Sequence, residues 1–210
     1  MADLAQQVQD VAEAWIDSSY YGDAERWTHI FWSEQRRFFP VFRRLDLTAV
    51  VELACGHGRH LEHYRHLAGR IVLMDVLESN IAACRARHGT LPNVEFMQNN
   101  GFDFQPLAEG SQTAIFCYDA MVHFSPDIVR SYIMDTARVL RPGGMALYHH
   151  SNYDAPDDRH YGLNPHARNR MTEAMMRAYA AEAGLEVVET KAFPWGEDKD
   201  LDRLTLLRAG

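Results

Sequence analysis

From residue 49 onward, short apolar runs of the sequence alternate with amphipathic segments. The apolar runs lie at residues 49–54, 70–74, 94–97, 113–118 and 144–150, and the amphipathic segments at 58–68, 78–88 and 126–140. Short apolar runs are typical of buried strands, and amphipathic segments are typical of helices that cover a sheet. The alternation therefore predicts an α/β fold, with a parallel sheet covered by helices on both faces.

The C-terminal part of the chain continues this pattern in a different order. A helix is predicted at about 170–183, where Gly184 ends it. Two apolar segments at 185–192 and 203–208 follow closely enough to pair as a hairpin. Between the sheet and this helix, residues 151–168 are polar and rich in turn formers, which predicts a long loop.

The N-terminal residues predict helices that cover the sheet. Apolar residues at helical spacing indicate helices over 4–17 and roughly 23–45, with Tyr20-Tyr21-Gly22 as the break between them. No repeat or low-complexity linker divides the chain, so we expect a single domain. Its expected parts are a helical cover (1–46), a ligand-binding core (49–150), a polar loop (151–170) and a closing helix with a hairpin (171–210).

Composition narrows the range of partners. The chain has 29 acidic and 21 basic residues and a formal charge of −8, whereas nucleic acids and anionic membranes require a basic surface. Three scattered cysteines do not indicate a disulfide framework, the polar N-terminus does not resemble a signal peptide, and no apolar run reaches the ~20 residues of a membrane span. We therefore expect a cytoplasmic protein that acts on a small molecule, without nucleic-acid or membrane partners. The oligomeric state stays open.

The clearest chemical signal is the stretch VVELACGHGRH, residues 50–60. It predicts a strand, then a turn in which Gly56 and Gly58 allow close backbone approach, then a helix whose first amides point at the ligand. Asp75 ends the next strand, where a carboxylate can accept hydrogen bonds from ribose hydroxyls. A dinucleotide and S-adenosylmethionine both fit such a site. Leu61 stands where the dinucleotide fingerprint has its last glycine, which disfavours a pyrophosphate.

Five motifs in sequence decide between these ligands. ELACGHG, Asp75, NNGFDF, CYDAMVHF and RVLRPGG each fall at a predicted strand end or before a strand, and together they resemble the class I S-adenosylmethionine-dependent methyltransferase family over roughly residues 49–150. The resemblance implies a doubly wound, Rossmann-like sheet of seven strands with a reversed last strand, S-adenosylmethionine as cofactor, and methyl transfer. Ala54 stands where the family usually has its first motif glycine.

The resemblance also implies roles for individual residues. The turn that would hold the methionine part of the cofactor comprises Glu52, Ala54, Cys55, Gly56 and Gly58, with Cys55 as a small space-filling residue. Asp75 would bind the ribose and Val76 would pack on the adenine, whose amino group would donate to the amide oxygen of Asn100. Gly101 and Phe102 would complete that wall, and Tyr118 and Asp119 would lie beside the sulfonium. Tyr21 could place an aromatic face over this cation.

Methyl transfer to a hydroxyl benefits from a general base. The candidates are Asp119, His123, His149 and His150. Adjacent strand residues point to opposite faces, so only one of His149 and His150 can face the cleft. We favour His150, which comes last before the loop, followed by His123. His57, His60, His63 and His66 spiral around the predicted helix at their three-residue spacing, so we expect no metal site there.

The polar loop suits a small polar acceptor, such as a sugar or glycan-related hydroxyl, and oxygen is favoured over nitrogen as the methylated atom. Its hydrogen-bonding residues are Arg159, His160, Tyr161, Asn164, His166, Arg168 and Arg170. Three alternatives stay open: a small-molecule N-methyltransferase, a binding module that holds S-adenosylmethionine without catalysis, and, least favoured, an NAD-dependent oxidoreductase.

Overall fold

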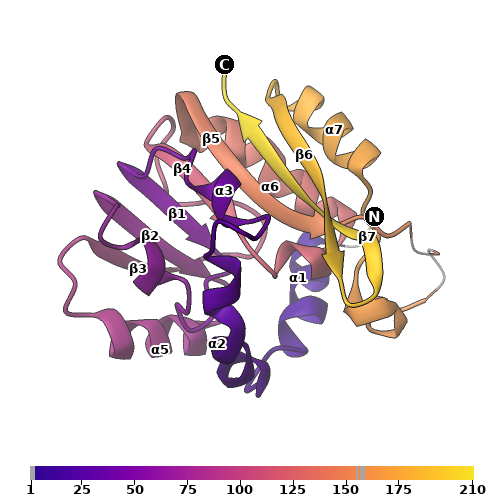
Figure 1. Cartoon of the computed structure of the whole chain (residues 1–210), viewed down its shortest axis with the longest axis horizontal. Helices are drawn as coiled ribbons and strands as arrows, with labels where there is room; N and C mark the ends of the chain where they lie inside the picture. The colour runs from indigo at the N-terminus through magenta and orange to yellow at the C-terminus, as the bar shows by residue number, and fades with distance from the viewer. Residues whose placement is uncertain (1–2, 155, 157–158) are drawn as a thin grey trace.

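The computed structural model describes residues 3–154, 156 and 159–210, which build a mixed sheet in the order β3-β2-β1-β4-β5-β7-β6 (Figure 1). The seven strands are β1 Ala49–Leu53, β2 Arg70–Asp75, β3 Val94–Gln98, β4 Gln112–Cys117, β5 Leu140–Ser151, β6 Glu186–Trp195 and β7 Asp198–Arg208. Strands β1 to β5 pair in parallel, whereas β7 runs antiparallel to both β5 and β6. The predicted doubly wound sheet with a reversed last strand is confirmed.

Helices cover both faces of this sheet. They are α1 Leu4–Glu13, α2 Tyr20–Phe31, α3 Phe39–Phe42, α4 Leu61–Tyr64, α5 Glu78–His88, α6 Pro126–Val139 and α7 Glu173–Glu182, with short 3₁₀ turns at Met121–His123, Tyr161–Leu163 and Pro165–Ala167. Successive strand residues point to opposite faces. In β1, Val51 and Leu53 belong to the apolar cluster that includes residues of α6 and α7, whereas Val50 packs with residues of α3, α4 and α5.

The N-terminal helices differ from the prediction. Tyr20, Tyr21 and Gly22 form the first turn of α2 instead of a break, because the chain turns earlier, where Asp17 has a left-handed φ of 53°. The segment predicted as one helix over 23–45 stops at Phe31. Pro40 lies in the first turn of the separate helix α3, where its missing N–H costs no hydrogen bond.

Three other boundaries also differ. The helix predicted over 58–68 is only the four-residue α4, because the turn after β1 continues to His60. Strand β5 begins at Leu140, directly after α6, so that Pro142-Gly143-Gly144 lies within the strand instead of before it. Strand β7 was predicted at 203–208 but begins earlier, at Asp198. The remaining strands and α5, α6 and α7 lie within a few residues of their predicted positions.

Helices α1 and α2 lie at the edge of the sheet where β1 and β2 end (Figure 1). Val8 of α1 belongs to the same buried cluster as the apolar residues of α6. The Val8 side chain packs directly over Gly101, and a Cβ atom on Gly101 would collide with it. Gly101 has a φ of +84° and follows β3. A glycine at this position therefore allows α1 to close over the carboxyl ends of the strands. No helix in the described part of the chain is long and apolar enough to cross a bilayer.

Candidate functional site

A cavity of about 980 Å³, including its open mouth, lies between the N-terminal helices and the carboxyl ends of the central strands. It is lined by the turn after β1, by the ends of β2 and β4, by the loop after β3, and by α1 and α2. Ten of the predicted site residues line it: Tyr21, Ala54, Cys55, Gly56, Asp75, Val76, Gly101, Tyr118, Asp119 and His123. The structure thus brings together in one cavity motifs that lie far apart in the sequence.

The turn after β1 forms one wall of this cavity. Ala54, Gly56 and Gly58 all have left-handed φ values, of 54°, 55° and 72°. A Cβ atom on Gly56 would lie 2.9 Å from the ring of Tyr21, and Tyr21 in turn stacks on His57 with 4.3 Å between ring centroids. Glycine therefore meets two requirements at position 56: a backbone conformation that L side chains adopt at a cost, and close approach of an aromatic ring.

Asp75 joins this turn to the end of β2. Its Oδ2 accepts from the Gly56 N–H at 2.9 Å, and its Oδ1 accepts from the Leu77 N–H at 2.9 Å and from Asn80 Nδ2 at 3.1 Å. Burial raises the pKa of the carboxyl, although the three donors oppose this shift. Asn80 also donates to the hydroxyl of Tyr21 at 2.9 Å, and burial raises the pKa of Tyr21 to about 12.

Asn99, and not Asn100, lines the cavity after β3. The Oδ1 atom of Asn99 is buried without a hydrogen-bond partner among the described residues, while its Nδ2 donates to Tyr132 Oη at 2.8 Å. Asn100 is exposed, and its Oδ1 accepts from the N–H groups of Phe102 and Asp103, both at 3.0 Å. The expectation that Asn100 presents its amide oxygen to the cavity is therefore wrong, because that oxygen closes a local turn.

Sequence reasoning missed Arg59, which follows the glycine turn and lines the cavity. Its Nη2 pairs with Asp119 Oδ2 at 2.9 Å, and the hydroxyl of Tyr20 donates to the same oxygen. The Nη1 of Arg59 is buried without a partner among the described residues. A buried donor on a charged group is costly to leave unsatisfied, so Arg59 Nη1 and Asn99 Oδ1 mark places where a ligand can bind.

The prediction that His150 faces the cavity is wrong. His150 is fully buried away from it, with 2.8 Å between Nε2 and the hydroxyl of Thr205 on β7. The register places the neighbouring His149 behind the cavity wall instead. Its Nδ1 accepts from the backbone N–H of Asp119 at 3.1 Å, and its ring stacks on Tyr118 with 4.9 Å between centroids.

His123 lines the cavity, as His57 and His60 also do. Its Nδ1 lies 2.8 Å from the carbonyl oxygen of Ala167, which can only accept, so the proton of the neutral ring is on Nδ1. Burial lowers the pKa of His123 to about 4, which keeps the ring neutral at pH 7. Trp15 packs against it, with 4.8 Å between ring centroids.

Three further predicted residues lie outside the cavity lining: Glu52, Gly58 and Phe102. Glu52 accepts from the hydroxyl of Tyr64 at 2.7 Å, and burial raises its pKa to about 8. A Cβ atom on Gly58 would meet Cys84 at 3.1 Å, so this glycine shapes the turn from behind.

Cys55, in contrast, lines the cavity. Burial raises the pKa of its thiol well above the usual value, which leaves a neutral thiol at the cavity wall.

Three of the four histidines at positions 57, 60, 63 and 66 make contacts with aromatic rings. Trp32 donates from Nε1 to His60 Nδ1 at 3.0 Å and stacks on His63 with 5.1 Å between centroids. Among the residues that the structure describes, no three His, Cys, Asp or Glu side chains are grouped so that they could hold a metal ion.

The fold and cavity define an α/β protein with a ligand site at the carboxyl edge of its sheet, and comparison with known proteins identifies its class. Residues 50–144 match the methyltransferase domain family. A probable S-adenosylmethionine-dependent methyltransferase of Mycolicibacterium smegmatis is 28% identical over 160 residues, which cover 74% of this chain and 60% of that protein. A human thiol S-methyltransferase is 28% identical over 123 residues, covering 55% of this chain and 49% of that protein.

Solved structures agree on the fold. The methyltransferase in a complex with the Trm112 activator from Haloferax volcanii has a TM-score of 0.67 at 20% identity, covering 90% of this chain and 94% of that one. An S-adenosylmethionine-dependent methyltransferase from Mesorhizobium loti has a TM-score of 0.64 at 18% identity, covering 81% and 96%. The family match and the relatives support a class I S-adenosylmethionine-dependent methyltransferase domain at residues 50–144, with S-adenosylmethionine as its cofactor. The chain spans 60% or less of the length of the curated relatives named above.

Proposed function

We propose that the chain transfers the methyl group of S-adenosylmethionine to a hydroxyl group of a small polar acceptor. The observation that carries this proposal is a pair of unsatisfied polar atoms on residues that line the cavity. Arg59 Nη1 is a cationic donor and Asn99 Oδ1 is an acceptor, and both are buried without a partner in the described structure. A molecule with a carboxylate at one end and an amino-substituted base at the other, as S-adenosylmethionine has, would satisfy both.

The residues of the cavity fit the rest of this cofactor. Arg59 would hold the methionine carboxylate, Asp75 the ribose hydroxyls, and Asn99 the adenine amino group, with Val76 against the base. When bound, the sulfonium supplies an already activated methyl group, so the protein mainly has to orient the acceptor and exclude water. Tyr20 and Tyr21 of α2 also line the cavity.

His123 is the proposed general base. The carbonyl of Ala167 fixes the proton on Nδ1, which leaves the Nε2 lone pair available to a hydroxyl in the cavity. Asp119 also lines the cavity, but its carboxylate is engaged by Arg59 and Tyr20. Asp119 therefore serves in this proposal to hold charge and orient groups, and His123 removes the proton.

A polar acceptor is supported by a second hollow beside His123. Its described lining includes Arg159, Tyr161, Asn164, Asn169 and Arg170. The hydroxyl of Tyr161 and the Oδ1 of Asn164 are buried without a partner in the described structure, and Asn169 Nδ2 donates to the carbonyl of His123 at 3.1 Å. The relatives' names do not decide the acceptor, since one is a thiol S-methyltransferase.

Calorimetry with S-adenosylhomocysteine and, separately, with NADH tests the first part of the proposal. Binding of S-adenosylhomocysteine without binding of NADH is expected, and the reverse would overturn it. A screen of hydroxyl, amine and thiol acceptors, followed by release of S-adenosylhomocysteine and by mass spectrometry of the product, tests the second part. Methylation confined to amines would favour an N-methyltransferase. Binding without turnover on any acceptor would favour a non-catalytic module.

A further inference from the structure

We propose that Arg168, Asp202 and His149 form a buried chain of positioning residues that fixes Asp119, and through it Arg59, at the methionine end of the cofactor site. This inference rests on the proposed cofactor site. It concerns residues that lie behind the cavity wall and do not line the cavity themselves.

The chain starts at an ion pair between the polar loop and β7. Arg168 donates from Nε to Asp202 Oδ1 at 2.9 Å and from Nη2 to Asp202 Oδ2 at 2.6 Å. Arg168 is 2% exposed and Asp202 is fully buried, and the guanidinium lies 4.7 Å from the ring centroid of Trp195. A two-point ion pair with this geometry fixes the orientation of the carboxylate as well as its charge.

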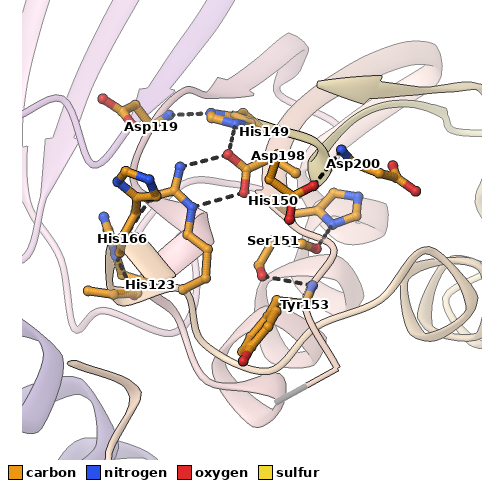
Figure 2. A network of polar contacts seen from close by, with 12 residues as sticks. Asp119, His123, His149, His150, Ser151, Tyr153, His166, Asp198 and Asp200 are labelled. Carbon is orange, nitrogen blue, oxygen red and sulfur yellow. Dashed lines mark hydrogen bonds and ion pairs between the residues drawn. The ribbon is translucent and has the colours of Figure 1, made fainter. Parts of the chain in front are cut away.

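His149 connects this carboxylate to the cavity wall, because it bonds both Asp202 and the backbone N–H of Asp119. Figure 2 shows the ring of His149 beside Asp119. Its Nε2 is 3.0 Å from Asp202 Oδ2, and its Nδ1 faces the backbone N–H of Asp119 at 3.1 Å. Because a backbone N–H can only donate, Nδ1 carries no proton, and the single ring proton is on Nε2. His149 is therefore neutral, and Arg168 balances the charge of Asp202.

Asp202 carries the charge that Arg168 balances. Burial alone would raise the pKa of Asp202, but the hydrogen bonds from His149 and Arg168 and the electrostatic attraction of both side chains hold it below its usual value. Asp202 thus remains a strong acceptor for His149 Nε2–H at neutral pH.

The far end of the chain is Asp119, which has a left-handed φ of 61°. Residues other than glycine adopt this conformation at a cost, so it persists where neighbouring groups enforce it. The bond from the Asp119 N–H to His149 provides such a constraint. It leaves the carboxylate 2.9 Å from Arg59 Nη2, while Arg59 Nη1 is buried without a partner among the described residues.

The same loop segment also fixes His123. The carbonyl of Ala167, the residue before Arg168, accepts from His123 Nδ1, and Asn169, the residue after it, donates to the carbonyl of His123. One short segment of the loop therefore positions both the proposed base and, through Asp202 and His149, the residue that orients Arg59. This arrangement couples the acceptor side of the site to its cofactor side.

The test compares two ligands and two substitutions of His149 by calorimetry. S-adenosylhomocysteine contains the amino-acid end that Arg59 would bind, and 5′-methylthioadenosine lacks it. In His149→Asn, the amide oxygen can replace Nδ1 as an acceptor for the Asp119 N–H, whereas His149→Leu removes the acceptor. We expect His149→Leu to weaken S-adenosylhomocysteine binding at least ~10-fold and to leave 5′-methylthioadenosine binding unchanged, while His149→Asn stays close to the wild type.

A cycle with Asp119→Ala shows whether the effect passes through Asp119. In that background, His149→Leu should cause no further loss of S-adenosylhomocysteine affinity. Equal losses in the Leu and Asn variants, or equal losses for both ligands, would overturn the positioning chain while leaving the proposed function intact. If the wild type binds neither ligand, the proposed function itself fails, and this inference fails with it.

A measurement on the wild type applies even if the leucine variant does not fold. In protein labelled with ¹⁵N-histidine, the signal of His149 is identified by its loss in His149→Asn. The Nε2–H neutral form at pH 7 would support the chain. A doubly protonated ring or an Nδ1–H form would overturn it.

Discussion

Arg59 and Asp119 form an ion pair at the cavity wall, with 2.9 Å between Nη2 and Oδ2 and with side chains that are only 12% and 3% exposed. The pair uses one side of the guanidinium. The other side, at Nη1, is buried and has no partner among the described residues. Since a guanidinium binds carboxylates through its fork of donors, the unpartnered Nη1 is the donor that we propose for an anionic ligand group.

Replacement of Arg59 by Met should weaken S-adenosylhomocysteine binding by a factor of roughly 10 to 100, because a hydrogen bond to a charged group contributes about 1.5–3 kcal/mol. Binding of 5′-methylthioadenosine should not change, because it has no carboxylate. Calorimetry with both ligands measures the difference. A similar loss for both would show that Arg59 supports the cavity without contacting the amino-acid end.

Asn99 should discriminate between adenine and hypoxanthine. The wild type should prefer S-adenosylhomocysteine over S-inosylhomocysteine, because Oδ1 can accept from an amino group and not from the carbonyl of hypoxanthine. Asn99→Leu should reduce this preference by about 10-fold, the effect of one hydrogen bond of roughly 1.4 kcal/mol. Asn100→Ala is the matched control, since Asn100 is exposed and bonds its own turn. Loss of the preference in Asn100→Ala would instead assign the base contact to that residue.

The strands of the core could be predicted from the sequence, but the exact residues of the site could not. The strands of the core were predicted closely because apolar periodicity reports burial directly. In two places the predicted functional residue was one position away from the residue that serves the site: Asn100 in place of Asn99, which lines the cavity, and His150 in place of His149, which supports the wall from behind. At a strand end, a shift of one residue moves a side chain to the opposite face, and composition alone does not set that register.

Arg59 and the exact bounds of the N-terminal helices were missed for a different reason. The ion pair of Arg59 with Asp119 joins two positions 60 residues apart, and neither position carries a local signal for the other. The break expected at Tyr20-Tyr21-Gly22 was based on the local preference of this segment, which the first turn of α2 accommodates. Tertiary packing of the aromatic ring of Tyr21 against Gly56 outweighs that local preference.

Gly56→Ala should impair both stability and binding. A Cβ atom at this position would lie 2.9 Å from the Tyr21 ring, and the φ of 55° disfavours any side chain, so we expect a loss of about 1 kcal/mol in the free energy of unfolding. S-adenosylhomocysteine affinity should fall as well, because Tyr21 must move. Gly22→Ala is the control: it lies in α2 with nothing within 4 Å of a Cβ atom, and alanine favours a helix by about 0.8–1 kcal/mol. Urea unfolding should show a lower free energy of unfolding for Gly56→Ala and a higher one for Gly22→Ala.

Substitution of His123 should separate catalysis from binding. His123→Gln should lower turnover of a hydroxyl acceptor by roughly 10²- to 10⁴-fold, the usual contribution of a general base, and should leave S-adenosylhomocysteine affinity nearly unchanged. Single-turnover kinetics with the acceptor found by screening, together with calorimetry, provide the two measurements. Turnover at the wild-type rate would remove His123 from the reaction and leave it a packing role against Trp15.

His150 should make the protein sensitive to acid. Burial lowers its pKa to about 4, whereas the unfolded chain has the usual value of 6.5. Between these values the unfolded state binds more protons, so stability is lost as pH falls below about 6.5, at about 1.4 kcal/mol per pH unit. His150→Gln does not titrate and should therefore lose about 2 kcal/mol less than the wild type between pH 7.5 and pH 5. Urea unfolding at both pH values measures this difference, in which the contributions of His123 and Glu52 cancel. The control is His166→Gln at an exposed position, which should lose as much free energy of unfolding between the two pH values as the wild type. If His150→Gln also loses as much as the wild type, His150 is not the acid-sensitive group.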